Sequence, residues 1–154
     1  LIELLIVVAI IGIIVAIAIP NLLNAIQRAK QRRTMGDIRS MATAVEAYAV
    51  DFNRYPPAAA ATLPSGLTYP ATKTTGKMKD YISPTYIRVT PVADGWNSWF
   101  LYDVDTNGQA YVIGSGGKDG KAEALYADGP TTDFNADIVY ANGQFIQYPE
   151  GVQR

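Results

Sequence analysis

The side chains best suited to chemistry in this sequence are carboxylates, because the chain has neither histidine nor cysteine. That composition removes the commonest general base, thiolate chemistry and most transition-metal sites. The stretch "DVDTNG" (residues 103–108) has the spacing that opens a calcium-binding EF-hand loop. However, Gly114 occupies the twelfth position, where such loops carry a bidentate glutamate. The alternating apolar residues on both sides favour a plain hairpin turn. Since no catalytic constellation remains, we predict that the chain is not an enzyme.

A single charged residue, Glu3, interrupts the apolar segment "LIELLIVVAIIGIIVAIAIP" at the start of the sequence. As a helix, the residues before Pro20 extend about 28 Å, close to the thickness of the hydrocarbon core of a bilayer. A secretory signal peptide has a basic start, a shorter apolar run and no such acid. A plain membrane anchor explains the length but not Glu3, whose charge costs on the order of a few kcal/mol at membrane depth. The segment predicts a membrane span in which the carboxylate has a further role.

An apolar stripe with helical spacing continues the pattern beyond Pro20. Apolar side chains recur at steps of three and four residues in "GDIRSMATAVEAYAVDF" (residues 36–52), at Ile38, Met41, Val45, Tyr48 and Phe52. Only Pro20 and Gly36 interrupt residues 1–52, and the prolines of "RYPPAAA" follow. We expect one helix of about 50 residues, roughly 75 Å long, with a kink at Pro20. Its first half is apolar on all sides, and its second half packs one stripe against a small domain.

The rest of the sequence predicts a small head domain. Residues 54–92 are rich in proline and predict an irregular loop with one short helix at "KMKDYI" (residues 77–82). Two pairs of apolar segments then flank turn sequences: "NSWFLYDV" and "QAYVIGS" around "DTNG", and "ADIVY" and "QFIQY" around "ANG".

These pairs predict an antiparallel sheet of about four strands within residues 93–154, packed on the helix stripe. Much of its contact area would come from aromatic side chains, namely Trp96, Trp99, Phe100, Tyr102 and Tyr111. The predicted fold class is therefore α+β. The predicted parts are the apolar half-helix 1–20, the amphipathic half-helix 21–53 and the head 54–154.

Charge is distributed unevenly along the chain, whose formal net charge is −1. Residues 21–40 form a basic collar, in which five basic side chains face one acidic residue, Asp37. The basic residues of the collar are Arg28, Lys30, Arg32, Arg33 and Arg39. Residues 41–154 carry eight basic and twelve acidic side chains. Because the folded part is acidic, we expect no nucleic-acid partner.

The N-terminal "LIELLIVVAIIGIIVAIAIPN", the amphipathic helix after it and the "YP" at residues 55–56 together resemble the type IV pilin superfamily. That superfamily includes type IV pilins and the pseudopilins of type II secretion. The resemblance implies a pilin-like fold and a structural subunit of a filament whose helices bundle in an apolar core. It also implies that Glu3 faces the amino terminus of a neighbouring subunit, where a wrong axial register would leave its charge unpaired. The alternative is that Glu3 merely reaches the lipid headgroups. The candidate assembly residues are Glu3, Gly12 and Pro20.

The same resemblance implies partners and a location. The subunit would be stored as a single-pass protein of the inner membrane, in contact with lipid. It would then join a periplasmic or cell-surface filament made of copies of itself. An inner-membrane assembly platform and a prepilin peptidase would act on it. In the family, a methylated aromatic residue lies two positions before the residue that corresponds to Leu1. Three roles stay open for the basic collar: solvation of the helix, pairing with acidic heads of neighbouring subunits, and contact with lipid headgroups.

The stretch "GSGGKDGKAEALYADGPTTDFNADIVY" (residues 114–140) resembles a glycine-rich loop of type II secretion major pseudopilins. In that group the loop binds one calcium ion through carboxylates and backbone carbonyls. The resemblance implies a calcium site at Asp119, Asp133 and Asp137, the one cofactor that we expect. The alternative is a loop held by hairpin turns and Asx hydrogen bonds.

The absence of cysteine, the "DGWNSWFLY" block and the Asp-rich C-terminal loop favour a major pseudopilin of type II secretion. One alternative is the major pilin of a surface type IV pilus, used in adhesion, motility or DNA uptake. Another is a minor pilin that acts as a binding module. A third is electron conduction along stacked aromatic side chains. The aromatic residues lie mostly in predicted strands and loops, where core packing is their usual role.

Overall fold

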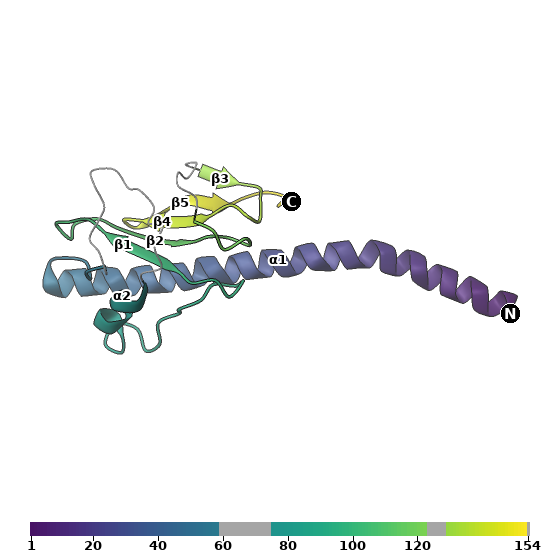
Figure 1. The fold of residues 1–154 in the computed structure, drawn as a ribbon, viewed down its shortest axis with the longest axis horizontal. Coiled ribbons are helices and arrows are strands. Elements are labelled where there is room, and N and C mark those ends of the chain that lie inside the picture. Colours follow the sequence, from purple (N-terminus) through teal and green to yellow (C-terminus); the bar gives the residue numbers. More distant parts are fainter. Residues whose placement is uncertain (59–74, 123–128, 154) are drawn as a thin grey trace.

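The computed structural model describes residues 1–58, 75–122 and 129–153. Within these ranges the fold is α+β, with one very long helix beside a small sheet (Figure 1). The helices are α1 (Ile2–Phe52) and α2 (Thr75–Ile82). The strands are β1 (Leu101–Val104), β2 (Tyr111–Ser115), β3 (Gly129–Thr131), β4 (Ile138–Ala141) and β5 (Gln144–Pro149).

Helix α1 is continuous over 51 residues, which confirms the predicted single helix. It passes through Pro20, where the missing N–H removes one helical hydrogen bond. The side-chain amide of Asn21 donates a hydrogen bond to the carbonyl oxygen of Ile17 at 3.2 Å, in the same turn. Figure 1 shows that the half of α1 that projects beyond the sheet bends away from the axis of the other half. The helix ends at Phe52, and the left-handed φ of 53° at Asn53 then turns the chain before Pro56.

Among the described residues the sheet has five strands in the order β1-β2-β4-β5-β3, one more than predicted. Both predicted hairpins are confirmed, because β1 pairs with β2 and β4 with β5 in antiparallel fashion. The prediction of a purely antiparallel sheet is wrong, since β3 lies parallel to β5. Strand β3 is three residues long and contains Pro130, so it lacks the alternation that would have revealed it. Strand β1 also begins later than predicted, because Asn97 takes a φ of 67° and turns the chain.

One face of the sheet packs on the second half of α1. Ile38, Met41, Val45 and Tyr48 of the predicted stripe are buried there. Phe52, the last member of the stripe, is 55% exposed, and its ring stacks on that of Tyr48. The predicted aromatic contribution to the core is confirmed for Phe100, Tyr102 and Tyr111, which are fully buried. It is wrong for Trp99, which is 55% exposed.

The opposite face of the sheet carries a second, smaller apolar cluster. Its buried members are Leu101, Val112, Val139 and Ala141. The predicted short helix is confirmed as α2, which contacts both α1 and β1. Residues 59–74 of the predicted irregular loop lie outside the described residues.

Candidate assembly surface and the junction between helix and head

The first half of α1 forms a candidate assembly surface that touches no other part of the described chain. Every residue from Leu1 to Ile26 is exposed. The helix contains an 18-residue window with a mean hydropathy of 3.2, none of it buried. By length and composition it is the one membrane-spanning candidate among the described residues. Water does not solvate such a surface without a large cost, so lipid or other protein must cover it.

The three candidate assembly residues lie along this surface rather than in one site. Glu3 is exposed in the first turn of the helix, where a negative charge interacts favourably with the helix dipole. A side chain at Gly12 would meet nothing within 4 Å. Pro20 lies near the far end of the exposed half. The single chain thus presents Glu3 and Gly12 to whatever covers the helix, and it offers Glu3 no basic partner among the described residues.

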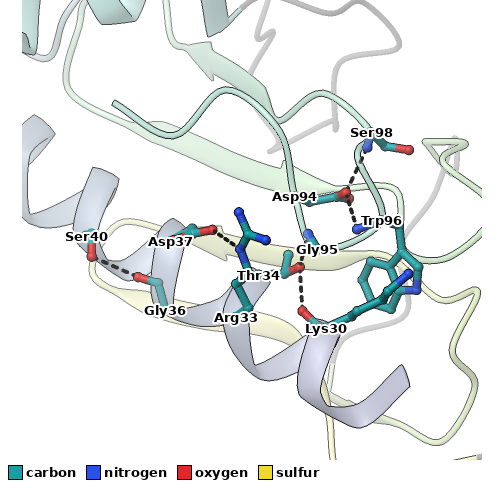
Figure 2. A network of polar contacts seen from close by, with 10 residues as sticks. All are labelled: Lys30, Arg33, Thr34, Gly36, Asp37, Ser40, Asp94, Gly95, Trp96 and Ser98. Carbon is teal, nitrogen blue, oxygen red and sulfur yellow. Dashed lines mark hydrogen bonds and ion pairs between the residues drawn. The ribbon is translucent and has the colours of Figure 1, made fainter. Parts of the chain in front are cut away.

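The junction between helix and head is built around Asp94, at the start of the "DGWNS" turn (residues 94–98). Asp94 is 3% exposed, and its Oδ1 accepts hydrogen bonds from the backbone N–H groups of Trp96 and Ser98, both at 2.9 Å (Figure 2). Its Oδ2 accepts a hydrogen bond from the hydroxyl of Ser115 at 2.6 Å. A carboxylate that accepts several donors fixes the shape of a turn. Asp94 therefore holds this turn rigidly against β2.

The same turn clamps the helix. The N–H of Gly95 donates to the hydroxyl of Thr34 at 2.9 Å, and that hydroxyl donates to the carbonyl oxygen of Lys30 at 2.9 Å (Figure 2). The indole N–H of Trp96 donates to the side chain of Gln27 at 2.6 Å. Only glycine fits at position 95, because a Cβ there would lie 2.5 Å from the carbonyl oxygen of Lys30. We call this set of contacts the clamp.

The C-terminal segment makes a second tie to the helix, within the same two turns as the clamp. The side-chain amide of Gln31 donates to that of Gln153 at 3.1 Å, and both residues are 4% exposed. The amide nitrogen of Gln153 also donates to the carbonyl oxygens of Thr131 and Glu150, at 2.7 and 2.9 Å. These bonds satisfy two buried amides and join α1, β3 and the segment after β5.

Tyrosine hydroxyls secure the other end of the head. Tyr111 donates to the carboxylate of Glu46 at 2.6 Å, and Tyr102 donates to the carbonyl oxygen of Pro56 at 2.6 Å. Burial raises the pKa of both phenols well above the ordinary value, and the hydrogen bond to Glu46 adds to the rise for Tyr111. A hydrogen bond to Asp51 raises the pKa of Tyr86 to about 12.

The basic collar divides according to what its side chains meet. Arg33 forms an ion pair with Asp37 at 3.6 Å. Burial raises the pKa of Asp37, and the guanidinium of Arg33 opposes that rise. The guanidinium of Arg39 lies 5.4 Å from the ring centroid of Phe145. Arg28 and Arg32 are exposed.

The predicted calcium residues lie on two loops that touch each other. The N–H of Lys118 donates to the carbonyl oxygen of Phe134 at 2.9 Å, which joins the loop of Asp119 to the loop of Asp133. Asp119 and Asp133 are exposed, and each accepts a hydrogen bond from the N–H two residues ahead in an Asx turn. Asp137 is buried. In the described ranges, which omit residues 123–128, no three acidic side chains are gathered as a metal site would need.

The stretch "DVDTNG" forms the hairpin turn between β1 and β2, as predicted. The carboxylate of Asp105 accepts hydrogen bonds from the N–H groups of Gln109 and Ala110, at 2.6 and 3.1 Å. Gly108 takes the positive φ that the turn needs.

Sequence reasoning missed the clamp. It treated "DGWNSWFLY" only as a point of family resemblance and assigned no role to Asp94 or Thr34. An Asp-Gly pair followed by Asn-Ser is a recognisable turn signal. The partner residues on the helix could not be inferred, because Thr34 is 61 positions from Gly95 and Gln27 is 69 positions from Trp96.

A long N-terminal helix with one unburied apolar half and one half packed on a small sheet defines a pilin-like subunit. Residues 21–139 match the family model described as type II secretion system (T2SS), protein G. The type II secretion system core protein G of Pseudomonas aeruginosa is 31% identical over 128 residues, which cover 80% of this chain and 86% of that protein. The protein of the same name from Vibrio cholerae is 30% identical over 125 residues, covering 78% and 81% of the two chains. The chain therefore belongs to the type II secretion system protein G family.

These comparisons confirm the predicted pseudopilin and support neither a surface pilin nor an enzyme. The type IV major fimbrial protein FimA of Dichelobacter nodosus is 53% identical, but over 51 residues that cover only 33% of each chain. That likeness is therefore local, whereas the family model spans all of the second half of the helix and most of the head.

Proposed function

We propose that this chain is the major subunit of a type II secretion pseudopilus. The apolar half of α1 stores it in the inner membrane as a single-pass protein. The same surface then packs against other copies in the core of a periplasmic filament. The complete exposure of residues 1–26 is the observation that carries the proposal. Burying one large apolar side chain is worth about 1.5–3 kcal/mol, so a surface of this size favours only states in which it is covered.

Two kinds of protein would act on the subunit besides its own copies. A prepilin peptidase would process the chain at its N-terminal side. An inner-membrane assembly platform would move it from lipid into the filament. Exchange of lipid for neighbouring helices is close to balanced in hydrophobic free energy, because lipid tails and apolar side chains are similar solvents. Because this exchange provides little driving force, extraction of the helix requires the work of an assembly platform.

Glu3 would set the axial register of the assembled helices. A purely apolar helix surface has many near-equivalent registers, whereas a carboxylate in a low dielectric is costly in every register that leaves it unpaired. Glu3→Ala should reduce filament assembly by at least about tenfold while the head stays folded. Asp80→Asn, which removes one exposed head carboxylate, serves as the control. Normal filaments from Glu3→Ala, counted by electron microscopy, would sink the register role.

The first test of the function itself is a deletion of this chain in its own cells. Loss of secreted proteins from the medium, with their accumulation in the periplasm, is the expected result. Electron microscopy of material sheared from cells with native expression should show no long surface filaments made of this chain. Normal secretion together with abundant surface filaments would contradict the proposal.

We also propose that calcium ties the loops of Asp119, Asp133 and Asp137 together. The contact between the two loops supports this, as does their polar composition, which suits a hard cation with oxygen ligands. Backbone carbonyls would have to complete the ligand set. The test is the melting temperature of the full chain in detergent, with millimolar calcium or with a chelator. Equal melting temperatures would end the calcium proposal, whereas a rise that Asp119→Asn removes would support it.

A further inference from the structure

Arg28 and Arg32 differ from the rest of the basic collar. They lie one helical turn apart on the same side of α1, and both are exposed. In the part of the chain that the structure describes, neither forms an ion pair, whereas Arg33 is paired with Asp37. Arg39 is placed over the ring of Phe145. Two neighbouring guanidinium groups that form no ion pair within the described residues are available to bind an anion.

A hollow of about 360 Å³ lies beside these two arginines, between α1 and the segment that follows β5. Its lining includes Arg28, Gln31 and Arg32 from the helix, with Glu150 and Gln153 from the C-terminal segment. Gln31 and Gln153 are buried and hydrogen-bonded to each other, so the wall that they form is fixed. Glu150 is exposed, and the three charged lining residues together carry a net charge of +1. A group with one negative charge would neutralise the hollow.

The position of the hollow along the helix indicates where that anion comes from. The exposed apolar surface of α1 extends to Ile26, and Arg28 follows about 3 Å further along the axis. The head first contacts the helix at Gln27, and the C-terminal segment lies at the end of the sheet that faces the projecting half (Figure 1). Arginines just beyond an apolar span extend their charged groups to the lipid headgroups.

We propose that Arg28 and Arg32 bind the phosphate of an anionic phospholipid headgroup while the subunit is stored in the membrane. Guanidinium groups bind phosphate oxygens in a bidentate manner, and two of them one turn apart present two such forks. The site holds the head at the membrane surface in a fixed rotation about the helix. The lipid must leave when the helix is extracted. This inference rests on the proposed storage of the apolar half in a bilayer.

The test uses the full chain reconstituted into phosphatidylcholine vesicles that contain spin-labelled lipid. Co-flotation of the protein with vesicles is measured first, because a failure there contradicts membrane storage itself. Electron paramagnetic resonance then gives the association of labelled phosphatidylglycerol relative to labelled phosphatidylcholine. We expect a clear preference for phosphatidylglycerol. A chain that inserts normally but prefers neither lipid overturns the headgroup site alone.

A matched pair of double variants separates a site from general charge. Arg28→Gln with Arg32→Gln should lower the preference by about fivefold for each arginine removed. Lys30→Gln with Arg33→Gln removes the same charge at the same depth, on the other side of the helix, and should have a much smaller effect. Equal losses in both double variants would show diffuse attraction and overturn the site. An unchanged preference with lost filament assembly in the Arg28/Arg32 variant would assign these residues to a neighbouring subunit and also overturn it.

A variant of opposite sign completes the test. Glu150→Gln removes the one acidic residue that lines the hollow, so it should raise the preference for phosphatidylglycerol. The residue is exposed, so this change should leave the fold intact. An equal or lower preference in Glu150→Gln would contradict binding in this hollow.

Discussion

The two halves of α1 share one helix but obtain their stability from different sources. The second half buries a stripe against the sheet and is held by the clamp, so its order depends on contacts within the chain. The first half buries nothing and is rich in Ile and Val, which are weak helix formers in water. Its order depends on the surroundings, because lipid forces a backbone to satisfy its own hydrogen bonds. One helix can therefore be ordered by contacts within the chain at one end and by its surroundings at the other.

The largest expected effect that separates the two halves comes from alkaline pH. All tyrosines lie at or beyond Tyr48, so none belongs to the first half. The raised pKa values of Tyr102 and Tyr111 mean that the folded head keeps protons that the unfolded chain releases above about pH 10. Stability from this source is complete below that pH. It falls above it by about 1.4 kcal/mol per pH unit for each of these tyrosines.

Circular dichroism of the full chain in neutral detergent measures this difference directly. The near-ultraviolet signal of the head should disappear between pH 10 and about 12, while the helical signal of the first half persists. Loss of both signals together would show that the two halves unfold as one unit. A near-ultraviolet signal unchanged throughout would contradict the role of the buried phenols.

The next largest effect should follow from a methyl group in the clamp. Gly95→Ala places a Cβ 2.5 Å from the carbonyl oxygen of Lys30, so the turn must move away from the helix. We expect a loss of about 3 kcal/mol in the free energy of unfolding of the head. The helical content of the first half in detergent should not change. Thermal unfolding followed at both spectral regions measures the two responses, and an unaltered melting temperature would contradict the clamp.

A smaller effect should come from the hydroxyl that the clamp uses. Thr34→Val keeps the shape of the side chain but leaves the N–H of Gly95 without its acceptor, at a cost of about 1–3 kcal/mol. Ser40→Ala is the matched control. The hydroxyl of Ser40 also donates to a helix carbonyl, that of Gly36, but it is exposed, and this bond lies within the helix (Figure 2). Denaturant unfolding measures the loss in the free energy of unfolding for each variant. Equal losses in the two variants would show that the Thr34 hydroxyl does not stabilise the junction.

The smallest effects on stability, and the sharpest comparison of the two halves, come from two glycines in open space. A Cβ at Gly12 or at Gly36 would meet nothing within 4 Å. Gly36→Ala should raise the stability of the head by about 0.5–1 kcal/mol, because alanine is the better helix former. Gly12→Ala should leave membrane insertion unchanged but reduce filament yield, because small residues let neighbouring helices approach closely. Equal filament yields from both variants would show that no neighbour packs at Gly12.

Local patterns predicted most of the elements, and contacts between distant segments explain the failures. The helix could be predicted from its apolar run and from the stripe that ends at Phe52. The two hairpins could be predicted because each pairs adjacent segments around an Asn-Gly turn. Strand β3 could not, because its partner is β5 and the pairing depends on where the chain returns. The exposure of Trp99 was missed for a similar reason: burial depends on which elements cover a side chain.

The candidate residues divide in the same way. Glu3 could be recognised as unusual from the composition of the segment around it, because a carboxylate is rare in such an apolar run. The clamp could not, since Thr34 and Gly95 have no local feature that connects them. Asp119 and Asp133 lie on two loops that contact each other, and whether calcium joins them stays a prediction.

The clamp has a mechanical consequence. It grips the helix between Gln27 and Thr34, at the end of the head nearest the projecting half. A pull along α1 towards the projecting half loads these bonds together with the Gln31–Gln153 tie before it reaches the hydrophobic core. Because Gln27, Gln31 and Thr34 lie within two turns of the helix, these bonds share the load. Pro20 lies outside this stretch, and the hydrogen bond missing there lowers the resistance of the projecting half to bending. The head therefore moves with the helix as one body when the helix is pulled.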